Sequence, residues 1–317
     1  MNNQKQAIAF DFNEDRVSNA SAAESLGMAL MRLAAKAARP IDYTGLSHAN
    51  KLISTVLPSD RFVRARMLDD TYFEFPYGDG YWGVLLDTKI PYSAPEEYFL
   101  MAVRDVDYAF VDCGANYGFM SALVTSDAYG KKPCIAIEAD PDTFKMLERN
   151  WHLNGQRFEL KHNAVFHKSG EWVSFGGGKH EARSIQDNAS DEKCNDVETI
   201  ALDTLEPWIK NQGREQLILK LDVEGVEISA LKGASKLLKK DPCILFEDHA
   251  SDKKHEVSKF MMEELNMKVF TSEKNGCRQL TSLEEIEALK RNPRVGYDFI
   301  AARGDFWPGL IQELKYQ

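Results

Sequence analysis

The stretch of sequence that best indicates the fold is YAFVDCGANYG, residues 108–118. It opens with an apolar run, reaches an acid at Asp112, and ends in a turn that contains Gly114 and Gly118. A helical pattern follows from Phe119 to Ala128. An apolar strand, a glycine-containing turn and a helix in this order are typical of the first strand–helix unit of a nucleotide-binding α/β domain.

The same pattern recurs along the rest of the chain. Apolar runs that end in an acid occur at residues 133–138, 217–222 and 243–247, and further apolar runs at 267–271 and 297–303. Helical patterns separate them at residues 142–153, 226–239 and in a segment that ends at Leu265. This alternation predicts an α/β fold with a mostly parallel sheet and helices on both faces.

Four acids stand at the ends of these apolar runs: Asp112, Glu138, Asp222 and Glu247. The carboxyl ends of parallel strands share one edge of a sheet, and the ligands of such sheets bind in a crevice at that edge. We therefore expect the four acids to converge on one site.

Composition excludes several classes of protein. The 317 residues are 44% hydrophobic and 28% charged, as in an ordinary globular protein, and the formal net charge is −10. Such a chain lacks the positive field that attracts nucleic acid, so we expect no nucleic-acid partner. The five scattered cysteines indicate free thiols. Because we find no signal peptide and no transmembrane segment, we expect a cytoplasmic protein.

The first hundred residues have a different pattern. Helices are expected within residues 20–38 and 44–56, and strands at 62–67 and 71–75. We predict an N-terminal helical and β extension at 1–104, a main domain at 105–305 and a C-terminal tail at 306–317. The helices either pack on the main domain or form a homodimer surface. Their few basic residues argue against a membrane-surface role.

An insertion interrupts the strand–helix alternation. Residues 172–175 have the pattern of a strand, whereas the glycines at 176–178 and the polar stretch 187–196 indicate a loop. This loop is either a plain surface connection or a lid over the site. Aromatic residues here and in residues 62–82 either pack or stack on a sugar acceptor: Tyr77, Tyr81, Trp82 and Trp172.

The turn at residues 112–118 has the spacing Gly-x-x-x-Gly. A dinucleotide site would instead show Gly-x-Gly-x-x-Gly, because its backbone approaches a pyrophosphate. Asp112 and Asn116 flank the first glycine, which fits a ligand without phosphate that meets side chains and backbone N–H groups. S-adenosylmethionine, with its aminocarboxylate, is such a ligand.

Two further strand ends carry informative charges. Glu138 suits the ribose diol of a nucleoside, whereas Asp140 suits the N-terminus of the next helix. Lys220, Asp222 and Glu224 alternate and therefore share one face of their strand. A lysine within an otherwise buried strand is costly unless it is paired, so we expect Lys220 to pair with a nearby acid.

Three motifs together resemble the FkbM family of S-adenosylmethionine-dependent methyltransferases: DCGANYG at 112–118, IEADP at 137–141 and LKLDVEGVE at 219–227. Asn150, Asn154 and the segments 163–165 and 198–205 also follow that family's pattern, and the resemblance runs from about Tyr108 to about Arg303. It implies a Rossmann-like class I methyltransferase fold with a mostly parallel seven-stranded sheet. It also implies methyl transfer to a hydroxyl in pathways for sugars, surface polysaccharides or polyketides.

The resemblance further implies roles for individual residues. Around the methionine end of the cofactor it places Asp112, Gly114, Asn116, Tyr117 and Gly118. It places Glu138 and Ala139 at the ribose, Asn163 and Ala164 near the adenine, and Asp222 near the methyl group. The sequence departs from the family at Cys113 and Tyr117, where small aliphatic residues are common, and at Ala139, where proline is common. Neither departure removes a polar group that the site needs.

A hydroxyl acceptor must lose its proton, so a general base is useful. We predict His249 as this base because histidine titrates near neutral pH, with Asp222 or Glu247 orienting it and Lys220 in the same catalytic set. Asp222, Glu247 and Glu224 are the other candidate bases. Alternatively, His249 only closes a loop hydrogen bond. A divalent metal held by Asp222, Glu247 and His249 is a further alternative, although we expect no metal.

The sequence therefore predicts an S-adenosylmethionine-dependent O-methyltransferase. The expected acceptor is a sugar hydroxyl in a surface polysaccharide, glycolipid or nucleotide-sugar precursor. One alternative acceptor is a polyketide or other small-molecule hydroxyl. The other alternative is a non-catalytic protein that keeps the cofactor-binding fold, against which the intact Gly114, Asn116, Gly118 and Glu138 argue.

Overall fold

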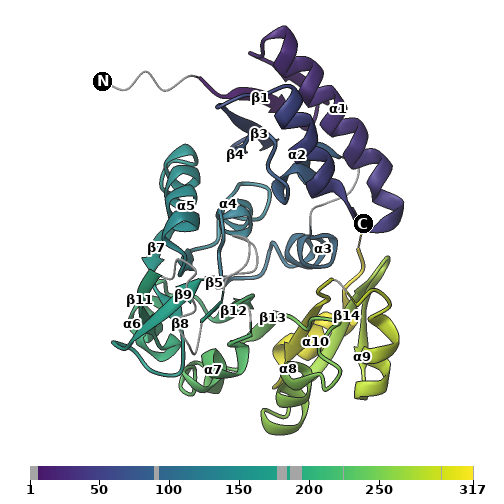
Figure 1. Cartoon of the computed structure of the whole chain (residues 1–317). Helices are drawn as coiled ribbons and strands as arrows, with labels where there is room; N and C mark the ends of the chain where they lie inside the picture. The colour runs from purple at the N-terminus through teal and green to yellow at the C-terminus, as the bar shows by residue number, and fades with distance from the viewer. Residues whose placement is uncertain are drawn as a thin grey trace. The chain divides into compact units, whose positions relative to one another are not determined.

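The computed structural model describes residues 6–88, 93–176, 184–185, 195–223, 225–293 and 295–316 (Figure 1). They form two compact units. The first contains the chain up to Ala94 together with Glu148–Gln156, and the second contains Pro95–Leu147 and Arg157–Gln317. Glu224 and most of the predicted lid, residues 177–183 and 186–194, lie outside the described residues.

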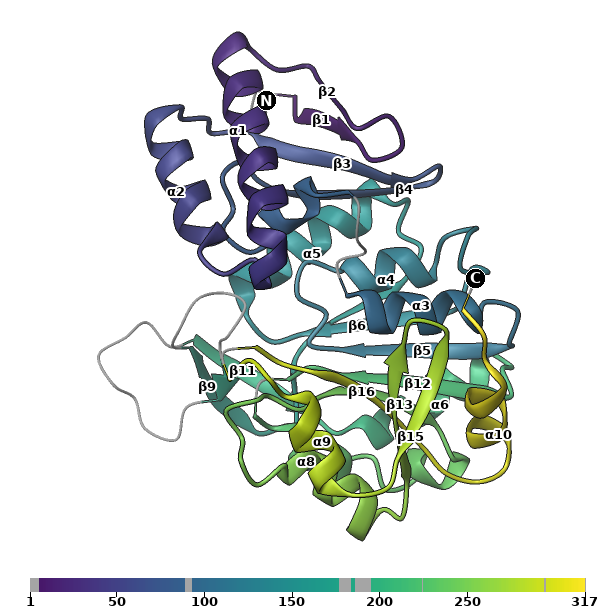
Figure 2. The same cartoon turned by 90° about the vertical axis from the view of Figure 1, so that its right-hand side faces the viewer.

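The first unit is a four-stranded sheet with two helices packed against it (Figures 1 and 2). Its order is β2-β1-β3-β4, with bounds β1 Ile8–Asp11, β2 Arg16–Ser18, β3 Phe62–Leu68 and β4 Thr71–Pro76. The helices α1 (Ala22–Ala38) and α2 (Leu46–Val56) lie side by side, and 3₁₀ turns follow at 39–41 and 82–86. The four predicted elements are confirmed. β1 and β2 were not predicted, because strands of four and three residues are too short to show alternation.

The outer edge of β4 is covered by side chains of the helix α5 (Pro141–Leu153). The Asn150 amide bonds both backbone groups of Glu74, with N–H to Oδ1 at 2.6 Å and Nδ2 to the carbonyl at 3.1 Å. Asn154, just beyond the helix, does the same for Tyr72, at 2.9 and 2.8 Å. Two amides one helical turn apart thus act as a substitute strand and satisfy an edge that would otherwise be unpaired.

The second unit is built on an eight-stranded sheet of order β15-β14-β16-β13-β12-β5-β6-β7. The bounds are β5 Tyr108–Cys113, β6 Cys134–Glu138, β7 Glu159–His162, β12 Gln216–Leu221, β13 Cys243–Glu247, β14 Lys268–Glu273, β15 Gly276–Leu280 and β16 Asp298–Ala302. The five strands from β7 to β13 are parallel, whereas β16 is antiparallel to both β13 and β14. The predicted α/β fold is confirmed, with one strand more than expected because β14 turns back directly into β15.

The helices of this unit are α3 Ala94–Ala102, α4 Phe119–Val124, the first half of α5, α6 Glu206–Asn211, α7 Glu227–Lys232, α8 Glu256–Lys259, α9 Leu283–Leu289 and α10 Phe306–Glu313. The turns η4 (Leu202–Leu205), η5 (Leu237–Lys240) and η6 (Phe260–Glu264) complete them. A small second sheet has the order β10-β9-β11-β8, with bounds β8 Ala164–Val165, β9 Trp172–Gly176, β10 Ser184–Ile185 and β11 Asn195–Ile200. The strand predicted at 172–175 is therefore confirmed as β9.

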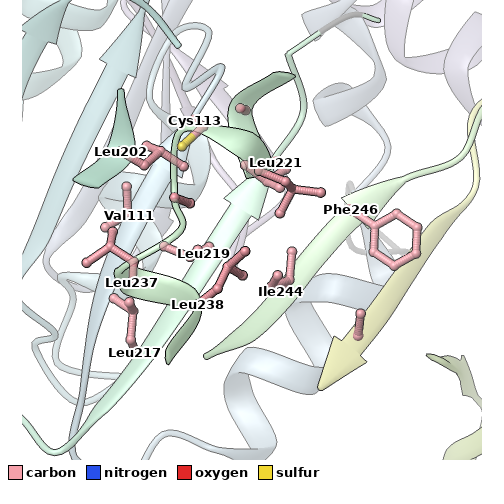
Figure 3. Close-up of a cluster of buried hydrophobic side chains, with 14 of the residues drawn as sticks. Val111, Cys113, Leu202, Leu217, Leu219, Leu221, Leu237, Leu238, Ile244 and Phe246 are labelled. Atoms are coloured by element: carbon pink, nitrogen blue, oxygen red, sulfur yellow. The ribbon is translucent and has the colours of Figure 1, made fainter. Parts of the chain in front are cut away.

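The alternation along β5 divides the core between the two faces of the large sheet. Val111 and Cys113 point to one face, where leucines of β12, η4 and η5 surround them (Figure 3). Tyr108 lies on the other face, and its ring packs at 6.4 Å from that of Trp307 in α10. Helices therefore cover both faces of the sheet, as the sequence predicts.

Two predicted helices are shorter in the structure. The helix expected at 119–128 ends at Val124, because the Thr125 hydroxyl turns back to the carbonyls of Ser121 and Ala122. The helix expected at 226–239 breaks at Gly233, whose carbonyl accepts the Asp203 N–H at 2.8 Å.

No helix in the described part of the chain combines the length and the apolar character that a membrane crossing requires.

Candidate functional site

The strand order of the second unit reverses direction between β5 and β12. From β5 the chain proceeds outward through β6 and β7, and it then returns to add β12 and β13 on the other side. Ligands of open α/β sheets bind at this reversal, outside the carboxyl ends of the strands. The topology therefore places the candidate site beyond the ends of β5 and β12.

The strand register lines up the predicted acids at this edge. Ile137 pairs with Cys113, Cys113 with Leu221, and Leu221 with Phe246. Each of the acids Glu138, Asp222 and Glu247 comes one residue later along the chain, at or just beyond the end of its strand. Since neighbouring strands lie about 4.8 Å apart, Glu247 is about 14 Å from Glu138 along the edge. The four acids thus share one edge but span four strands, with Asp112 and Asp222 at its centre.

The loop Gly114–Gly118 is held by its own backbone. The N–H groups of Gly114 and Ala115 both donate to the Ile137 carbonyl, at 3.0 and 2.9 Å. That of Asn116 donates to Glu138 Oε2, and those of Tyr117 and Gly118 donate within the loop. All five N–H groups are therefore used inside the protein. The loop can offer a ligand carbonyls and side chains, rather than the free N–H groups expected from the sequence.

Gly114 is required for this loop to meet β12. It has a positive φ of 75°, and a Cβ there would lie 1.8 Å from the Asp222 carbonyl oxygen. Asn116 and Gly118 also have positive φ, at 51° and 85°. Alternating left-handed residues fold the loop back under the end of β6, which explains the Gly-x-Asn-x-Gly spacing.

Asp112 is buried and only half satisfied. Its Oδ2 accepts a hydrogen bond from Ser121 Oγ at 2.6 Å, whereas its Oδ1 has no hydrogen-bond partner among the described residues. Burial raises the pKa of Asp112, and the Lys220 ammonium on the neighbouring strand partly offsets this. A buried carboxylate oxygen without a partner is rare in native proteins, so it points to a group that binds there.

Lys220 pairs with Asp222, as the sequence predicts. Its Nζ lies 2.9 Å from Asp222 Oδ2, and its side chain is 9% exposed, whereas that of Asp222 is 40% exposed. Burial alone would lower the pKa of Lys220, but the carboxylates of Asp222, Glu96 and Asp112 raise it above its ordinary value. Lys220 is thus a fixed positive charge that leaves Asp222 reachable from solvent.

Glu96 was not recognised as a site residue from the sequence. It is buried on α3 and acts on Lys220 electrostatically. It follows Pro95 in the first turn of α3, where acidic residues are common, so no local pattern distinguishes it. Only the tertiary packing of α3 near the end of β12 brings its charge to the site.

Asp140 has the capping role predicted for it, whereas the predicted ribose role of Glu138 stays a prediction. The Glu138 carboxylate accepts the N–H of Asn116 on Oε2 and that of Asp140 on Oε1, both at 2.8 Å. Burial raises the pKa of Glu138 to about 7, although these two hydrogen bonds oppose the shift. Asp140 Oδ1 accepts the N–H groups of Asp142 and Thr143, at 3.1 and 2.8 Å, and so caps α5.

The residues predicted near the adenine flank Glu138. The Asn163 N–H donates to the Glu138 carbonyl at 3.1 Å, and its side chain donates to the carbonyl of Glu198. Ala164 is buried in β8, and Ala139 accepts at its carbonyl from His162 Nε2 at 3.1 Å. These residues build the wall beside the end of β6.

Beyond β13, the structure places Glu247 and His249 differently. The Glu247 carboxylate lies against Gly296, where a Cβ would fall 1.1 Å from its Oε1. His249 is exposed, and its Nδ1 shares a hydrogen bond of 2.6 Å with Ser251 Oγ. This is the loop-closing contact named above as the alternative, so a role for Asp222 or Glu247 in orienting His249 stays a prediction.

Among the described residues, no group of three or more His, Cys, Asp or Glu is arranged to hold a metal ion, the set Asp222, Glu247 and His249 included.

A second buried cluster follows β13 that the sequence did not reveal. Lys290 is fully buried and bonds Asp248 Oδ1, while Ser258 donates to Asp248 Oδ2. Lys290 Nζ also lies 2.8 Å from His255 Nδ1, and His255 Nε2 lies 2.9 Å from Glu287. Its members come from residues 248–290, which is why no short motif shows them.

Three of the predicted sugar-stacking aromatics lie in the first unit. Tyr77 and Trp82 are buried, and the Trp82 ring packs 4.6 Å from that of Phe73. Tyr81 packs edge-on against Trp82 at 5.0 Å. Packing therefore explains these residues, whereas Trp172 on β9 is 69% exposed and remains free to meet a ligand.

The family model described as "Methyltransferase FkbM domain" matches residues 112–278, just over half of the chain, including the four acids Asp112, Glu138, Asp222 and Glu247. The chain belongs to this family. The match of this FkbM-domain protein begins at Asp112 in β5 and ends within β15. No curated protein matches the chain.

Solved structures show weaker similarity. The methyltransferase FkbM from Methylobacillus flagellatus KT is 16% identical, with a TM-score of 0.40 over 63% of this chain and 44% of that one. A precorrin-6y C5,15-methyltransferase from Geobacter metallireducens GS-15 is 12% identical, with a TM-score of 0.36 over 66% and 88%. TYW2 from Pyrococcus horikoshii, in complex with MeSAdo, is 15% identical, with a TM-score of 0.34 over 81% of each chain. The chain thus spans less than half of the first of these proteins, and its family membership rests on the family model.

Proposed function

We propose that this FkbM-domain protein is an S-adenosylmethionine-dependent O-methyltransferase. Its proposed acceptor is a sugar hydroxyl in a surface polysaccharide, glycolipid or nucleotide-sugar precursor. The observation that carries the proposal is the carboxylate row at the reversal of the sheet, where Asp112 Oδ1 is buried without a hydrogen-bond partner among the described residues.

The residues at this edge fit a nucleoside that carries an amino acid. Glu138 accepts backbone N–H groups on both carboxylate oxygens, and the acceptor capacity that remains suits the hydroxyls of a ribose diol. Asp112 Oδ1 is the acceptor left over for an ammonium group. The five used N–H groups of the loop explain why a phosphate would find no donors there.

When bound, S-adenosylmethionine supplies a methyl group already activated by the sulfonium. The task left to the protein is to hold the acceptor oxygen in line with that methyl group and to receive its proton. Asp222 is suited to a position beside the methyl group, because Lys220 fixes it at the end of β12 while its side chain stays 40% exposed. Glu247 stands one strand further along the same edge. Two carboxylates at neighbouring strand ends favour an acceptor with several hydroxyl groups, as in a sugar.

His249 is the proposed general base. It lies exposed two residues beyond Glu247. Its Nδ1 accepts the Ser251 N–H at 3.1 Å, so the neutral ring carries its hydrogen on Nε2, and the lone pair that can take a proton is the one on Nδ1. To act as a base, the ring must release its contact with Ser251.

Isothermal titration with S-adenosylmethionine and S-adenosylhomocysteine tests the cofactor site. We expect binding by the wild-type protein and its loss in Glu138→Ala. The matched control is Asp142→Ala, which removes an acid four residues away that is 69% exposed. Equal binding by wild type and Glu138→Ala would contradict the proposed site. If the wild type binds neither compound, even with candidate glycans present, the non-catalytic alternative gains support.

Turnover with a panel of sugar acceptors tests the base. His249→Ala is expected to lower kcat by about 10²–10⁴-fold, the usual contribution of a general base. Ser251→Ala removes the hydroxyl contact but keeps the backbone N–H of residue 251 on Nδ1, so it should lower kcat far less. Unchanged turnover in His249→Ala would eliminate this assignment. Loss of turnover with a chelator, restored by Mg²⁺, would instead support the metal alternative.

A further inference from the structure

Helix α1 has two apolar faces, although only one of them is buried in the first unit. Met28, Met31 and Ala35 are buried against that unit. On the opposite face Leu26, Leu30 and Leu33 are 54%, 40% and 63% exposed. A helix that is apolar all round is normally covered on all sides, so the outward face calls for a partner.

The charged residues of α1 do not serve the outward face. Glu24 is buried and accepts hydrogen bonds from Ser59 Oγ at 2.7 Å and from Arg61 Nη1 at 2.8 Å. Arg32 forms an ion pair with Asp15, and Lys36 Nζ lies 3.5 Å from the same carboxylate. Every charge on the helix is thus engaged within the first unit, while the residues that α1 turns outward are uncharged: Ala22, Ala23, Ser25, Leu26, Ala29, Leu30, Leu33 and Ala37.

Helix α2 adds to this apolar surface. It packs along α1 within the first unit, and its Leu52 and Val56 are 67% and 70% exposed (Figure 2). These two residues stand one helical turn apart, so they form a second short row.

The spacing on α1 identifies the kind of partner. Ala23, Leu26, Leu30, Leu33 and Ala37 alternate at intervals of three and four residues, which is the a/d spacing of a helix that packs against another helix. A membrane-surface helix would instead place several free Lys and Arg beside its apolar face, whereas the two cations of α1 outside its apolar seam, Arg32 and Lys36, both lie against the carboxylate of Asp15. An uncharged seam of this kind is complementary to itself, because neither copy presents a charge to repel or to leave unpaired.

We propose that a second copy of this chain covers the outward face of α1, with the two α1 helices packed about a two-fold axis near Leu30. Leu30 is the central residue of the five, so in a symmetric pairing it meets Leu30 of the partner subunit. The alanines at both ends of the seam allow the helices to approach closely. This inference concerns a different surface from the proposed cofactor site and does not depend on it.

Sedimentation of the full chain from about 1 to about 100 µM tests the proposal, since a dimer must respond to concentration. The wild type should sediment at twice the chain mass of 35.9 kDa. Leu30→Glu and Leu33→Glu should each raise the dissociation constant at least about tenfold, because each would bury a charge in the seam. Asn13→Glu is the matched control, since it adds the same charge at an exposed turn off the face. Circular dichroism should show each variant folded like the wild type.

Cysteine cross-linking adds a test that depends on geometry. Leu30→Cys should form a disulfide-linked dimer on oxidation, whereas Asn13→Cys should not. A wild type that stays monomeric at the highest concentration would overturn the proposal, and so would a dimer unaffected by both leucine variants. Binding of the monomer to vesicles of anionic phospholipid, lost in Leu33→Glu, would assign the face to lipid and likewise overturn it.

Discussion

The ends of β5 and β13 each bury an aspartate beside a serine and a lysine, yet they treat the aspartate differently. After β13, Asp248 has both oxygens occupied, one by Lys290 and one by Ser258. At the end of β5, Ser121 occupies one oxygen of Asp112, while Lys220 turns to Asp222 and leaves Asp112 Oδ1 without a hydrogen-bond partner among the described residues. The same three residue types thus make one closed cluster and one open cluster.

The difference separates structure from function. A closed cluster satisfies every group it buries, so it holds the loop after β13 and offers nothing to a ligand. An open cluster keeps a costly unpaired acceptor at the reversal of the sheet, which is reasonable only if another molecule completes it. Each of the following predictions tests whether this distinction holds.

Among these variants, Lys290→Met should cause the largest loss in the free energy of unfolding, because it opens the closed cluster. The Asp248 charge would remain buried without its cation, and such losses cost about 3–5 kcal/mol of the free energy of unfolding. Lys220→Met should cost less, because Asp222 is 40% exposed and can be solvated. Urea unfolding of the two variants measures the contrast. Equal losses in both would remove the distinction between the clusters.

Asp112→Asn should act on binding instead of folding. A hydrogen bond to a charged group contributes about 1.5–3 kcal/mol, so the affinity for S-adenosylhomocysteine should fall by about 10- to 150-fold. Asp248→Asn is the matched variant, and it should lower the free energy of unfolding while leaving the affinity within about twofold of the wild type. Calorimetric titration of both variants with S-adenosylhomocysteine measures these affinities, and urea unfolding measures their stabilities. The opposite pattern would show that the ligand is recognised at β13.

Glu138 should make binding pH-dependent. Its pKa is raised by burial to about 7, so the carboxylate that accepts the ribose hydroxyls takes up a proton as the pH falls through 7. Affinity should therefore decrease on acidification, by up to about tenfold per pH unit below the pKa. Glu138→Gln should bind more weakly but lose this dependence. A variant that keeps the wild-type pH profile would assign the titration to another group.

Asp140→Ala should produce the smallest change in stability and in affinity, although Asp140 lies two residues from Glu138. As the N-cap of α5 it contributes about 1 kcal/mol to stability, and its removal should lower the urea midpoint slightly. Ligand affinity should be unchanged. A large loss of affinity would show that Asp140, too, belongs to the open part of the edge.

Much of the open cluster could be predicted from the sequence, because its residues are local to strand ends. The acids follow apolar runs, and the i, i+2 spacing of Lys220 and Asp222 in a strand already implies that they pair. The capping role of Asp140 follows from its place before Pro141. A periodic pattern interrupted by charge is therefore enough to find such groups.

The closed cluster could not be predicted, because it joins residues that are distant in sequence. Asp248 and Lys290 are separated by an entire strand hairpin and α9, and no pattern in either segment indicates the other. Helix ends were also missed where a side chain competes for the backbone, as Thr125 does after α4. Such outcomes depend on tertiary contacts, which periodicity does not record.

The amide pairing of Asn150 and Asn154 with β4 bears on how this protein was assembled. The chain leaves the first unit at Ala94, yet the residues that finish its sheet come later, on and just after α5. A gene fragment that ends at residue 94 would encode a sheet with an unprotected edge. Recombination that exchanges only this fragment between relatives would therefore succeed where the recipient already carries two asparagines four residues apart on the matching helix. The N-terminal unit is thus encoded by two separate stretches of the chain, and the first depends on the second for a protected sheet edge.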